Sequence, residues 1–443
     1  MQINVIKIYT VITALLFAFS CNKNSGKPEI SGVIKEHAVE ISDASSIDRL
    51  IEKVGDKSLV LLGEASHGTS EFYIWRDKIS RRLIEEKGFS FIVVEGDWSP
   101  CFEVNLYIKG IAHNDKTASE VLKKNFKRWP PWMWANSEVA KLVEWLRDYN
   151  SELPLDERVG FYGMDVYGQW VSIDRVKKYL QDSGIDTLQV LEENYKGFTR
   201  FAPDEWNYAR AVAQGMPPVY SDMKIVTDTL RKNRDNLEQL NRLDYLNAKQ
   251  NSIVAKNAEE YYRLAILDGP DGWNSRVYHM EETVWRLFDF YGENGRGIVW
   301  AHNTHIGDAR ATSMAERGQV NIGQLAREKI GEENVFSVGF STFRGTVKAG
   351  YRWGLPGEVM TVPEGISNSY EYLFNKSGYD EFLLLLDDSI RENTAFNERR
   401  GHRAIGVVYD PAMERFGNYV PTILPRRYDA LIFIKETEAV SPL

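Results

Sequence analysis

The segment SLVLLGEASHG, residues 58–68, places an uninterrupted apolar run directly before an acid and a histidine that are three positions apart. Short apolar runs without alternating polar positions are typical of strands that are buried on both faces of a parallel sheet. In such a sheet, ligands bind beyond the carboxyl ends of the strands. The segment therefore predicts an α/β fold, and it places Glu64 and His67 where a functional site is expected.

Six more runs rich in β-branched and aromatic residues are expected to be strands: 89–96, 158–165, 295–303, 334–340, 403–410 and 428–436. Helical stretches separate most of these strands, which indicates a mostly parallel sheet in an α/β/α sandwich. The long stretch between the third and fourth of the seven strands has helical periodicity, and we interpret it as an insertion that caps the sheet.

The same patterns divide the chain into segments. Gly, Asn and Pro punctuate the region before the last two strands, which favours a small α+β subdomain there. The expected segments are a lipoprotein signal peptide at 1–20, a polar tether at 21–45, the first part of the α/β core at 46–165, the helical insertion at 166–290, the second part of the core at 291–344, the small α+β subdomain at 345–400 and the last strands of the core at 401–443.

The first residues resemble a bacterial export signal. Lys7 precedes an apolar run over 8–20 that is too short to span a bilayer but has the length of a signal-peptide core. The run ends in a sequence, 18–21, that resembles a lipobox, so we expect Cys21 to be lipidated; the alternative is an ordinary secretory signal with a chance cysteine. The expected location is the cell envelope, with the protein anchored to a membrane by its N-terminal lipid.

The amino-acid composition and net charge argue against some classes of function. The chain has 43% hydrophobic and 26% charged residues, a balance that suits a folded globular protein. Its formal net charge is -9 and it has no basic stripe, which argues against nucleic-acid binding. Cys101 is the only cysteine besides Cys21, so no intramolecular disulfide is expected.

Acid and imidazole side chains follow three of the predicted strands. They are Glu64 and His67 after the first strand, Glu95 after the second, and His302 with His305 after the fourth. Because parallel strands end at the same edge of a sheet, we expect these residues to meet in one functional site. Asp165 also follows a strand, but a carboxylate there commonly caps the next helix, and we expect it to do only that.

A helix is expected after the first strand, with Thr69 or Ser70 as its N-cap and Gly88 as its C-terminal stop. Its apolar stripe consists of Phe72, Trp75, Ile79 and Leu83. Arg76 lies at the margin of this stripe, where a buried guanidinium requires a partner, and Glu95 is one candidate. The remaining histidines are interpreted as structural: His37, His113, His279 and His402.

Longer motifs extend this pattern. They include LGEASHGTSEFYIWRDKISRRLIEEKGFSFIVVEGDW at 62–98, RWPPWMWANSEVAKLVEWLRDYN at 128–150, FYGMDVYG at 161–168, VWAHNTHIGD at 299–308, RGQVNIGQLARE at 317–328 and the C-terminal segment 402–443. From about residue 45 to the C-terminus, the chain resembles the erythromycin esterase family through this combination of motifs.

The resemblance implies a hydrolase that opens a macrolide lactone, or cleaves another ester, by water attack without a covalent intermediate, a metal or another cofactor. It implies that His67 is the general base, and that the other site positions are Glu64, Arg76, Glu95, His302 and His305. A further motif at 274–284 matches less closely, because Glu281 replaces a small residue and Thr283 replaces an asparagine. Its Arg276 is a candidate substrate contact.

The chemistry fits these residue types. Imidazole has an intrinsic pKa of about 6.5, so a neutral His67 can take a proton from water. Either Glu64 or Glu95 would hold the tautomer or the water. Either His302 or His305 would stabilise the oxyanion that forms during attack on an ester, and the sequence leaves that choice open.

Three alternatives stay open. Ser66 is a candidate nucleophile, although Glu64 occupies the first glycine position of the G-x-S-x-G elbow. A metal site is a second hypothesis, with the ligand set Glu64, His67, Glu95, His302 and His305. The third is a lipoprotein that binds an amphiphile without turning it over: Trp129 and Trp132 flank a Pro-Pro pair and are candidates for lining a ligand pocket, whereas Trp134 is expected to pack in the core.

Overall fold

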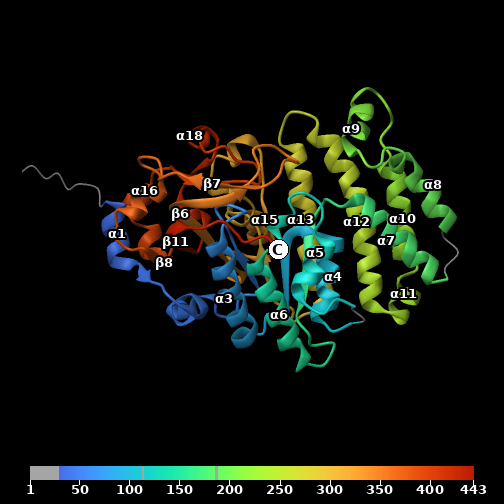
Figure 1. Ribbon diagram of the computed structural model, residues 1–443, viewed down its shortest axis with the longest axis horizontal. Coiled ribbons are helices and arrows are strands. Elements are labelled where there is room, and N and C mark those ends of the chain that lie inside the picture. Colours follow the sequence, from blue (N-terminus) through green and yellow to red (C-terminus); the bar gives the residue numbers. More distant parts are fainter. Residues whose placement is uncertain (1–28, 112–113, 185–187) are drawn as a thin grey trace, which may run out of the picture.

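The computed structural model describes residues 29–111, 114–184 and 188–443. Within them, a nine-stranded sheet lies at the centre of the molecule, with helices on both faces (Figure 1). The strand order is β1-β8-β11-β6-β2-β5-β3-β4, and β7 pairs with β6. The strands are β1 Val39–Glu40, β2 Leu59–Leu62, β3 Phe91–Asp97, β4 Gly160–Asp165, β5 Gly297–Trp300, β6 Val335–Ala349, β7 Glu358–Val362, β8 Glu381–Leu385 and β11 Ala430–Thr437.

The six neighbouring strands from β11 to β4 are parallel, whereas the pairs formed by β1, β7 and β8 are antiparallel. Successive side chains of a strand point to opposite faces of the sheet. On β2, Val60 and Leu62 therefore pack with Phe72 of α3 (Ser70–Lys87), while Leu61 packs with Val277 of α13 (Asp271–Tyr291). The predicted α/β fold with a mostly parallel sheet is confirmed.

The helix α3 follows its sequence signals closely. It begins after Thr69 and ends at Gly88, whose φ of 68° lies in the left-handed region that favours glycine. Thr69 does not cap the helix with its side chain; its hydroxyl contacts the hydroxyl of Ser66 instead. Arg76 is fully buried beneath the sheet-facing side of the helix, as its position at the apolar margin predicts.

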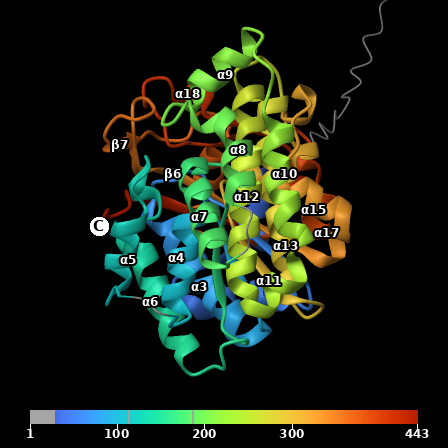
Figure 2. The ribbon, with the colours of Figure 1, turned by 90° about the vertical axis from the view of Figure 1, so that its right-hand side faces the viewer.

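The helical stretch between β4 and β5 stands beside the sheet, on the right of Figure 1 and facing the viewer in Figure 2. It consists of α7 Gln169–Asp182, α8 Leu188–Thr199, α9 Glu205–Ala213, α10 Tyr220–Lys232, α11 Arg234–Leu240, α12 Arg242–Ala265 and α13. The first six helices share a hydrophobic cluster of their own around Tyr195 and Tyr208, whereas α13 packs against the sheet. The helix α13 therefore covers part of one face of the sheet.

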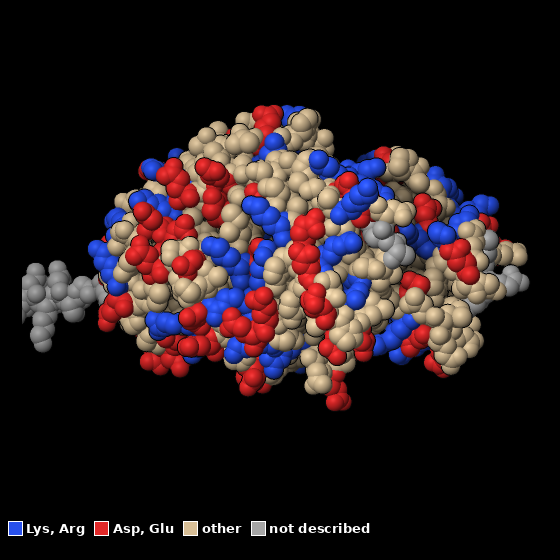
Figure 3. Space-filling view, turned by 60° about the horizontal axis from the view of Figure 1, so that its bottom comes forward, with Lys and Arg blue, Asp and Glu red and all other residues tan. Residues whose placement is uncertain are grey.

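The remaining helices cover the sheet and its ends. They are α1 Ile30–His37, α2 Asp48–Val54, α4 Trp98–Ile108, α5 Ala118–Asn125, α6 Ser137–Ser151, α14 Asn303–Ile306, α15 Ile322–Ile330, α16 Tyr370–Asn375, α17 Asp388–Arg391, α18 Glu414–Gly417 and α19 Leu424–Arg427. On the face shown in Figure 3, acidic and basic side chains are interspersed, and no continuous basic stripe crosses it.

The expected tether at 21–45 is wrong in its second half. The helix α1 buries Ile30, Val33 and Ile34, which have the i, i+3, i+4 spacing of an apolar helix face. The short strand β1 then joins the edge of the sheet by pairing with β8. Cys21, the predicted signal peptide and His113 lie outside the described residues. Among the described helices, none is long and apolar enough to cross a membrane.

The region after β6 also differs from expectation. The strand β8 lies in the central sheet between β1 and β11, so the region 345–400 does not stand apart as a small subdomain. Its run FLLL at 382–385 packs into both hydrophobic layers, which explains why the sheet takes it up. The domain boundaries expected elsewhere in the chain stay predictions.

The predicted core strand at 403–410 is wrong. The strand β9 (Arg400–Arg403) pairs with β10 (Tyr419–Thr422) in a separate two-stranded sheet. The following residues cross the carboxyl edge of the central sheet, where the Ile405 N–H donates to the carbonyl of Ala65. Of the expected last strands at 401–443, only β11 therefore belongs to the central sheet.

Candidate active site

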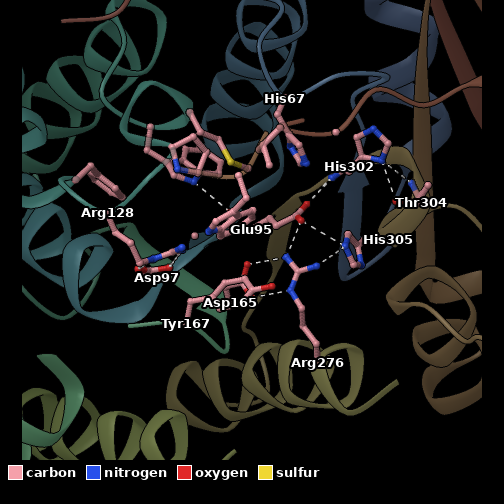
Figure 4. A pocket seen from close by; sticks show the side chains of 18 of the residues that line it. His67, Glu95, Asp97, Arg128, Asp165, Tyr167, Arg276, His302, Thr304 and His305 are labelled. Atoms are coloured by element: carbon pink, nitrogen blue, oxygen red, sulfur yellow. Dashed lines mark hydrogen bonds and ion pairs between the residues drawn. The ribbon is translucent and has the colours of Figure 1, made fainter. Parts of the chain in front are cut away.

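The carboxyl ends of β2, β5, β3 and β4 lie side by side, because these strands are parallel and adjacent in this order. The loops that follow them bring together the acid and imidazole residues predicted from the sequence. The rings of His67 and His302 are 5.0 Å apart between centroids. The residues after β2 and β5 thus share one site, which also includes Glu95, Asp165 and His305 (Figure 4).

His67 is oriented by a carboxylate that an arginine holds in turn. Its Nδ1 lies 2.8 Å from Oε1 of Glu64, and Oε2 of Glu64 lies 2.7 Å from Nη2 of Arg76. Glu64 and Arg76 are both fully buried, and the guanidinium also lies over the rings of Tyr73 and Trp300 at 4.4 and 4.6 Å. Arg76 is therefore paired with Glu64, and the expectation that Glu95 might be its partner is wrong.

Glu95 instead belongs to a second network, centred on Arg276 of α13. Nη2 of Arg276 lies 2.8 Å from Oε1 of Glu95, and the same guanidinium donates two hydrogen bonds of 2.8 and 2.7 Å to the carboxylate of Asp165. Oε2 of Glu95 accepts a hydrogen bond of 2.9 Å from the backbone N–H of His302. This arrangement fixes the end of β3 relative to the loop after β5.

Asp165 is therefore not a helix cap, contrary to the sequence-based expectation. The next helix, α7, begins after Gly168 and has no side-chain cap, while Asp165 binds Arg276. The Arg276 side chain is only 13% exposed and is held by two carboxylates. These contacts give Arg276 a positioning role in the site; whether it also touches substrate stays a prediction.

His305 lies against both the second network and an aromatic ring. Its Nε2 is 3.3 Å from Oε1 of Glu95 and 3.1 Å from Nη1 of Arg276. Its ring stacks on Trp273 with centroids 4.5 Å apart and planes 6° from parallel. Trp273 was not singled out in the sequence, although it lies three residues before Arg276 and so on the same face of α13.

The tautomer of His302 follows from its contacts. Nδ1 accepts a hydrogen bond of 3.2 Å from the backbone N–H of Thr304 and lies 2.8 Å from the Thr304 hydroxyl. An acceptor nitrogen carries no proton, so a neutral His302 carries its proton on Nε2. That Nε2 is buried and has no hydrogen-bond partner among the described residues, so it is an unpaired donor. Thr304 is a second positioning residue, which the sequence did not single out.

The pKa values of His67 and His302 are shifted in opposite directions. Burial alone would lower the pKa of His67, but the carboxylates of Glu95 and Glu64 outweigh it, so the pKa is raised above its ordinary value. Burial, together with the proximity of His67, lowers the pKa of His302 well below its ordinary value, despite the opposing effect of Glu95. His67 thus gains affinity for a proton, whereas His302 stays neutral.

The acids of the second network are held in their charged form. Burial by itself raises the pKa of Glu95, yet His305, His67 and Arg276 outweigh it and lower the pKa well below its ordinary range. The pKa of Asp165 is also lowered, because Arg276 outweighs the effect of burial. Both carboxylates therefore carry a negative charge opposite the imidazoles.

The side chains that line a common cavity of about 390 Å³ include His67, Glu95, Asp165, Arg276, His302 and His305. Its other walls come from the end of β3 and the start of α4, the segment around Trp134, and the crossing segment after β9, which contributes Ala404, Gly406 and Val407. Trp134 lies in the hydrophobic core, as the sequence favours, and it also lines the cavity. Of the two tryptophans expected to line a pocket, Trp132 is buried in the hydrophobic core and lines neither this cavity nor its larger neighbour, while Trp129 lines the neighbour.

The residues proposed for the alternative chemistries have other contacts. Ser66 is buried with its hydroxyl against Thr69, and it does not line the cavity. In the part of the chain that the structure describes, no group of three or more His, Cys, Asp or Glu side chains is arranged to hold a metal ion. The two carboxylates of the hypothetical metal site are each paired with an arginine.

Known proteins resemble this chain both in sequence and in fold. The family model for erythromycin esterase matches residues 84–437. The erythromycin esterase type II of Escherichia coli is 21% identical over 316 residues, which cover 67% of this chain and 72% of that protein.

Three solved structures share the fold. A protein from Bacillus cereus matches with a TM-score of 0.76 at 21% identity, over 94% of this chain and 98% of its own. A succinoglycan biosynthesis protein matches with a TM-score of 0.75 at 22% identity over the same shares of the two chains. A mutant of the erythromycin esterase EreC in its open conformation matches with a TM-score of 0.67 at 17% identity, over 90% of this chain and 97% of its own. The family match spans most of the chain and, of the site built above, covers the residues from Glu95 onward but not Glu64, His67 and Arg76. We conclude that the protein is a hydrolase belonging to the erythromycin esterase family.

Proposed function

We propose that the protein cleaves a carboxylic ester or a macrolide lactone by attack of water, with His67 as the general base. The observation that carries this proposal is the Arg76–Glu64–His67 chain. Because Nδ1 of His67 faces the Glu64 carboxylate, its proton lies on that nitrogen, and Nε2 is left to accept a proton from water. General-base catalysis of this kind contributes about 10²- to 10⁴-fold to a rate.

The positive charge that His67 gains in this step is balanced locally. Glu64 is in contact with the ring, and Glu95 raises the affinity of His67 for the proton. Each of the two carboxylates is paired with an arginine. The site therefore requires little reorganisation when the imidazolium forms, which is the condition under which electrostatic stabilisation is most effective.

Among the two candidate oxyanion donors, we assign this role to His302. Its Nε2–H has no other partner, and its ring lies 5.0 Å from that of His67. A carbonyl oxygen placed against Nε2 of His302 would present its carbon to a water held by His67. His305 is engaged with Glu95 and Arg276, so we assign it to positioning.

We also propose a substrate class and a location for the protein. The names of the Escherichia coli relative and of EreC support a macrolide lactone as the first candidate substrate.

The apolar run at 8–20 followed by Cys21 supports an envelope lipoprotein. Metabolic labelling with a fatty-acid probe, compared between the full chain and Cys21→Ser, tests the lipid anchor independently of activity.

Hydrolysis is tested by incubating a panel of macrolide lactones and simple aryl esters with the protein in ¹⁸O-labelled water. We expect one labelled oxygen in the carboxylate product, and we expect His67→Ala to abolish its formation while the circular dichroism spectrum stays unchanged. A wild-type rate in that variant would remove His67 from the mechanism. Unchanged compounds with measurable binding would favour the amphiphile-binding alternative.

The metal alternative is tested on the same assay. Elemental analysis of the purified protein is combined with turnover before and after dialysis against a chelator. We expect turnover to survive chelation, because the arginines already neutralise the two carboxylates. A stoichiometric transition metal whose removal abolishes turnover would overturn the proposed water-and-base mechanism.

A further inference from the structure

A second cavity, of about 720 Å³, adjoins the catalytic cavity and shares the side chains of Arg128, Tyr167 and Trp353 with it. Seven aromatic residues line it, and we call it the aromatic chamber. They are Trp129, Tyr167, Trp170, Trp206, Tyr261, Tyr262 and Trp353. The helices α7, α9 and α12 of the helical insertion form one side of the chamber. The loop that contains Trp353 forms part of the other side.

The rings of the chamber contact one another and form a continuous wall. Trp206 lies 5.2 Å from Tyr262, Tyr262 lies 5.0 Å from Tyr261, and Tyr261 lies 5.4 Å from Tyr167, all as near-perpendicular pairs between ring centroids. Trp129 and Trp353 lie 4.6 Å apart on the other side. Edge-to-face packing of this kind holds the rings at fixed angles to one another.

The charge inside the chamber is set by one carboxylate. Arg128 also lines the chamber, but Asp97 neutralises its guanidinium through two hydrogen bonds of 2.6 and 2.5 Å. Glu205 accepts a hydrogen bond of 3.2 Å from Nε1 of Trp170 and forms no ion pair with any described residue. Burial raises the pKa of Tyr262, and the negative charge of Glu205 adds to this effect.

Aromatic faces together with an unpaired carboxylate are the chemistry that recognises ammonium groups. The negative face of an aromatic ring attracts a cation, most strongly where water is excluded. A carboxylate adds a direct charge interaction that a neutral apolar group cannot use. An anionic ligand would instead meet Glu205 at close range and be repelled.

We propose that the aromatic chamber binds a positively charged alkylammonium group of the substrate while the ester of the same molecule lies in the catalytic cavity. The two cavities adjoin at Arg128, Tyr167 and Trp353, so a molecule that extends past these side chains would reach both. This inference rests on the proposed function for the identity of the reacting group. The recognition of ammonium by the chamber can be tested without any turnover.

The binding test uses choline and its uncharged isostere 3,3-dimethylbutan-1-ol, which have the same shape and differ in charge. Titration is followed by the fluorescence of the chamber tryptophans and by calorimetry. We expect choline to bind about tenfold more tightly than the alcohol, and Glu205→Gln to remove most of this difference. Glu193→Gln removes the same charge from an exposed position on α8 and serves as the matched control, with wild-type selectivity. Equal binding of the two probes would overturn the proposal, as would a Glu205→Gln variant that keeps full selectivity for choline.

The kinetic test uses a pair of esters that differ only in a trimethylammonium or a tert-butyl group at the end of the acyl chain. We expect the ratio of kcat/KM for the cationic ester over the neutral ester to fall about tenfold in Glu205→Gln and in Trp206→Leu. A ratio that is unchanged in both variants would refute the link between the chamber and the substrate. Failure of the proposed hydrolysis is distinguishable, since then neither ester turns over while choline still binds selectively.

Discussion

The Glu64→Gln variant separates the two roles of the most deeply buried acid in the site. The substitution keeps the shape of the side chain and an oxygen that can accept from Nδ1 of His67, but it removes the charge. Two consequences follow from the structure: His67 loses a carboxylate that raises its pKa, and Arg76 becomes a fully buried cation without an anion.

The expected magnitudes differ for activity and stability. Losing the anion that stabilises the imidazolium is expected to lower kcat by about 10²- to 10⁴-fold. Leaving Arg76 buried and unpaired is expected to lower the free energy of unfolding by about 3–5 kcal/mol. The pH dependence changes as well: His67 acts as a base only when neutral, so kcat/KM rises with pH through its pKa, and this rise is expected at lower pH in the variant.

The double variant Glu64→Gln/Arg76→Met is the control that separates the two effects. Replacing both partners of a buried ion pair is often neutral for stability. We therefore expect urea denaturation to show most of the lost stability restored, while kcat stays low because His67 still lacks its anion. A Glu64→Gln variant with wild-type kcat and an unshifted pH profile would refute the assignment of Glu64 to His67, and a double variant that regained activity would show that only the unpaired arginine had been harmful.

Further predictions concern the other groups of the site. His302→Leu is expected to lower kcat by about 10²- to 10³-fold with a smaller change in KM, and His302→Gln to recover part of the loss because its amide can donate to an oxyanion; equal rates for the two variants would contradict the donor role. Ser66→Ala is expected to keep turnover within a few-fold of wild type, and no covalent adduct is expected with a fluorophosphonate; trapping of Ser66 would instead favour a serine hydrolase. The pKa of Asp165 is lowered in the fold, so its pairing with Arg276 stabilises the protein fully above the ordinary carboxyl pKa of about 4, and this contribution is lost as the pH falls through the folded pKa. In that window the free energy of unfolding is expected to fall by an extra ~1.4 kcal/mol per pH unit in wild type and not in Asp165→Asn, as measured by urea denaturation.

The convergence of the site could be predicted because it depends on sheet topology alone. Apolar runs locate the strands, and parallel strands end at one edge, so the residues after 62, 94 and 300 must meet wherever the strands are adjacent. The burial of Arg76 followed from its angular position on α3. Both inferences depend on the regular spacing of side chains along strands and helices, and this spacing can be recognised in the local sequence.

The pairing within the site could not be predicted in the same way. Three acids, Glu64, Glu95 and Asp165, and two arginines allow several pairings, and the choice depends on which helix lies beneath which strand end. Arg76 comes from α3 and Arg276 from α13, on opposite faces of the sheet, so each arginine takes the carboxylate that its own face presents. The strand predicted at 403–410 failed for a related reason: Arg403, at the end of β9, pairs with Glu414 in a separate hairpin, and the apolar residues that follow it close over the cavity instead.

The two histidines that face each other across the cavity receive distinct tasks from their surroundings. The pKa of His67 is raised by Glu95 and Glu64, and each of these carboxylates is paired with an arginine. His302 contacts Thr304 and the neighbouring His67, and its pKa is lowered. A pair of titratable groups whose environments move their pKa values apart can supply a base and a neutral donor at the same pH. Because protonation of His67 further disfavours a charge on His302, a proton taken up by His67 stays on that ring, and His302 keeps the Nε2–H that we propose as the oxyanion donor.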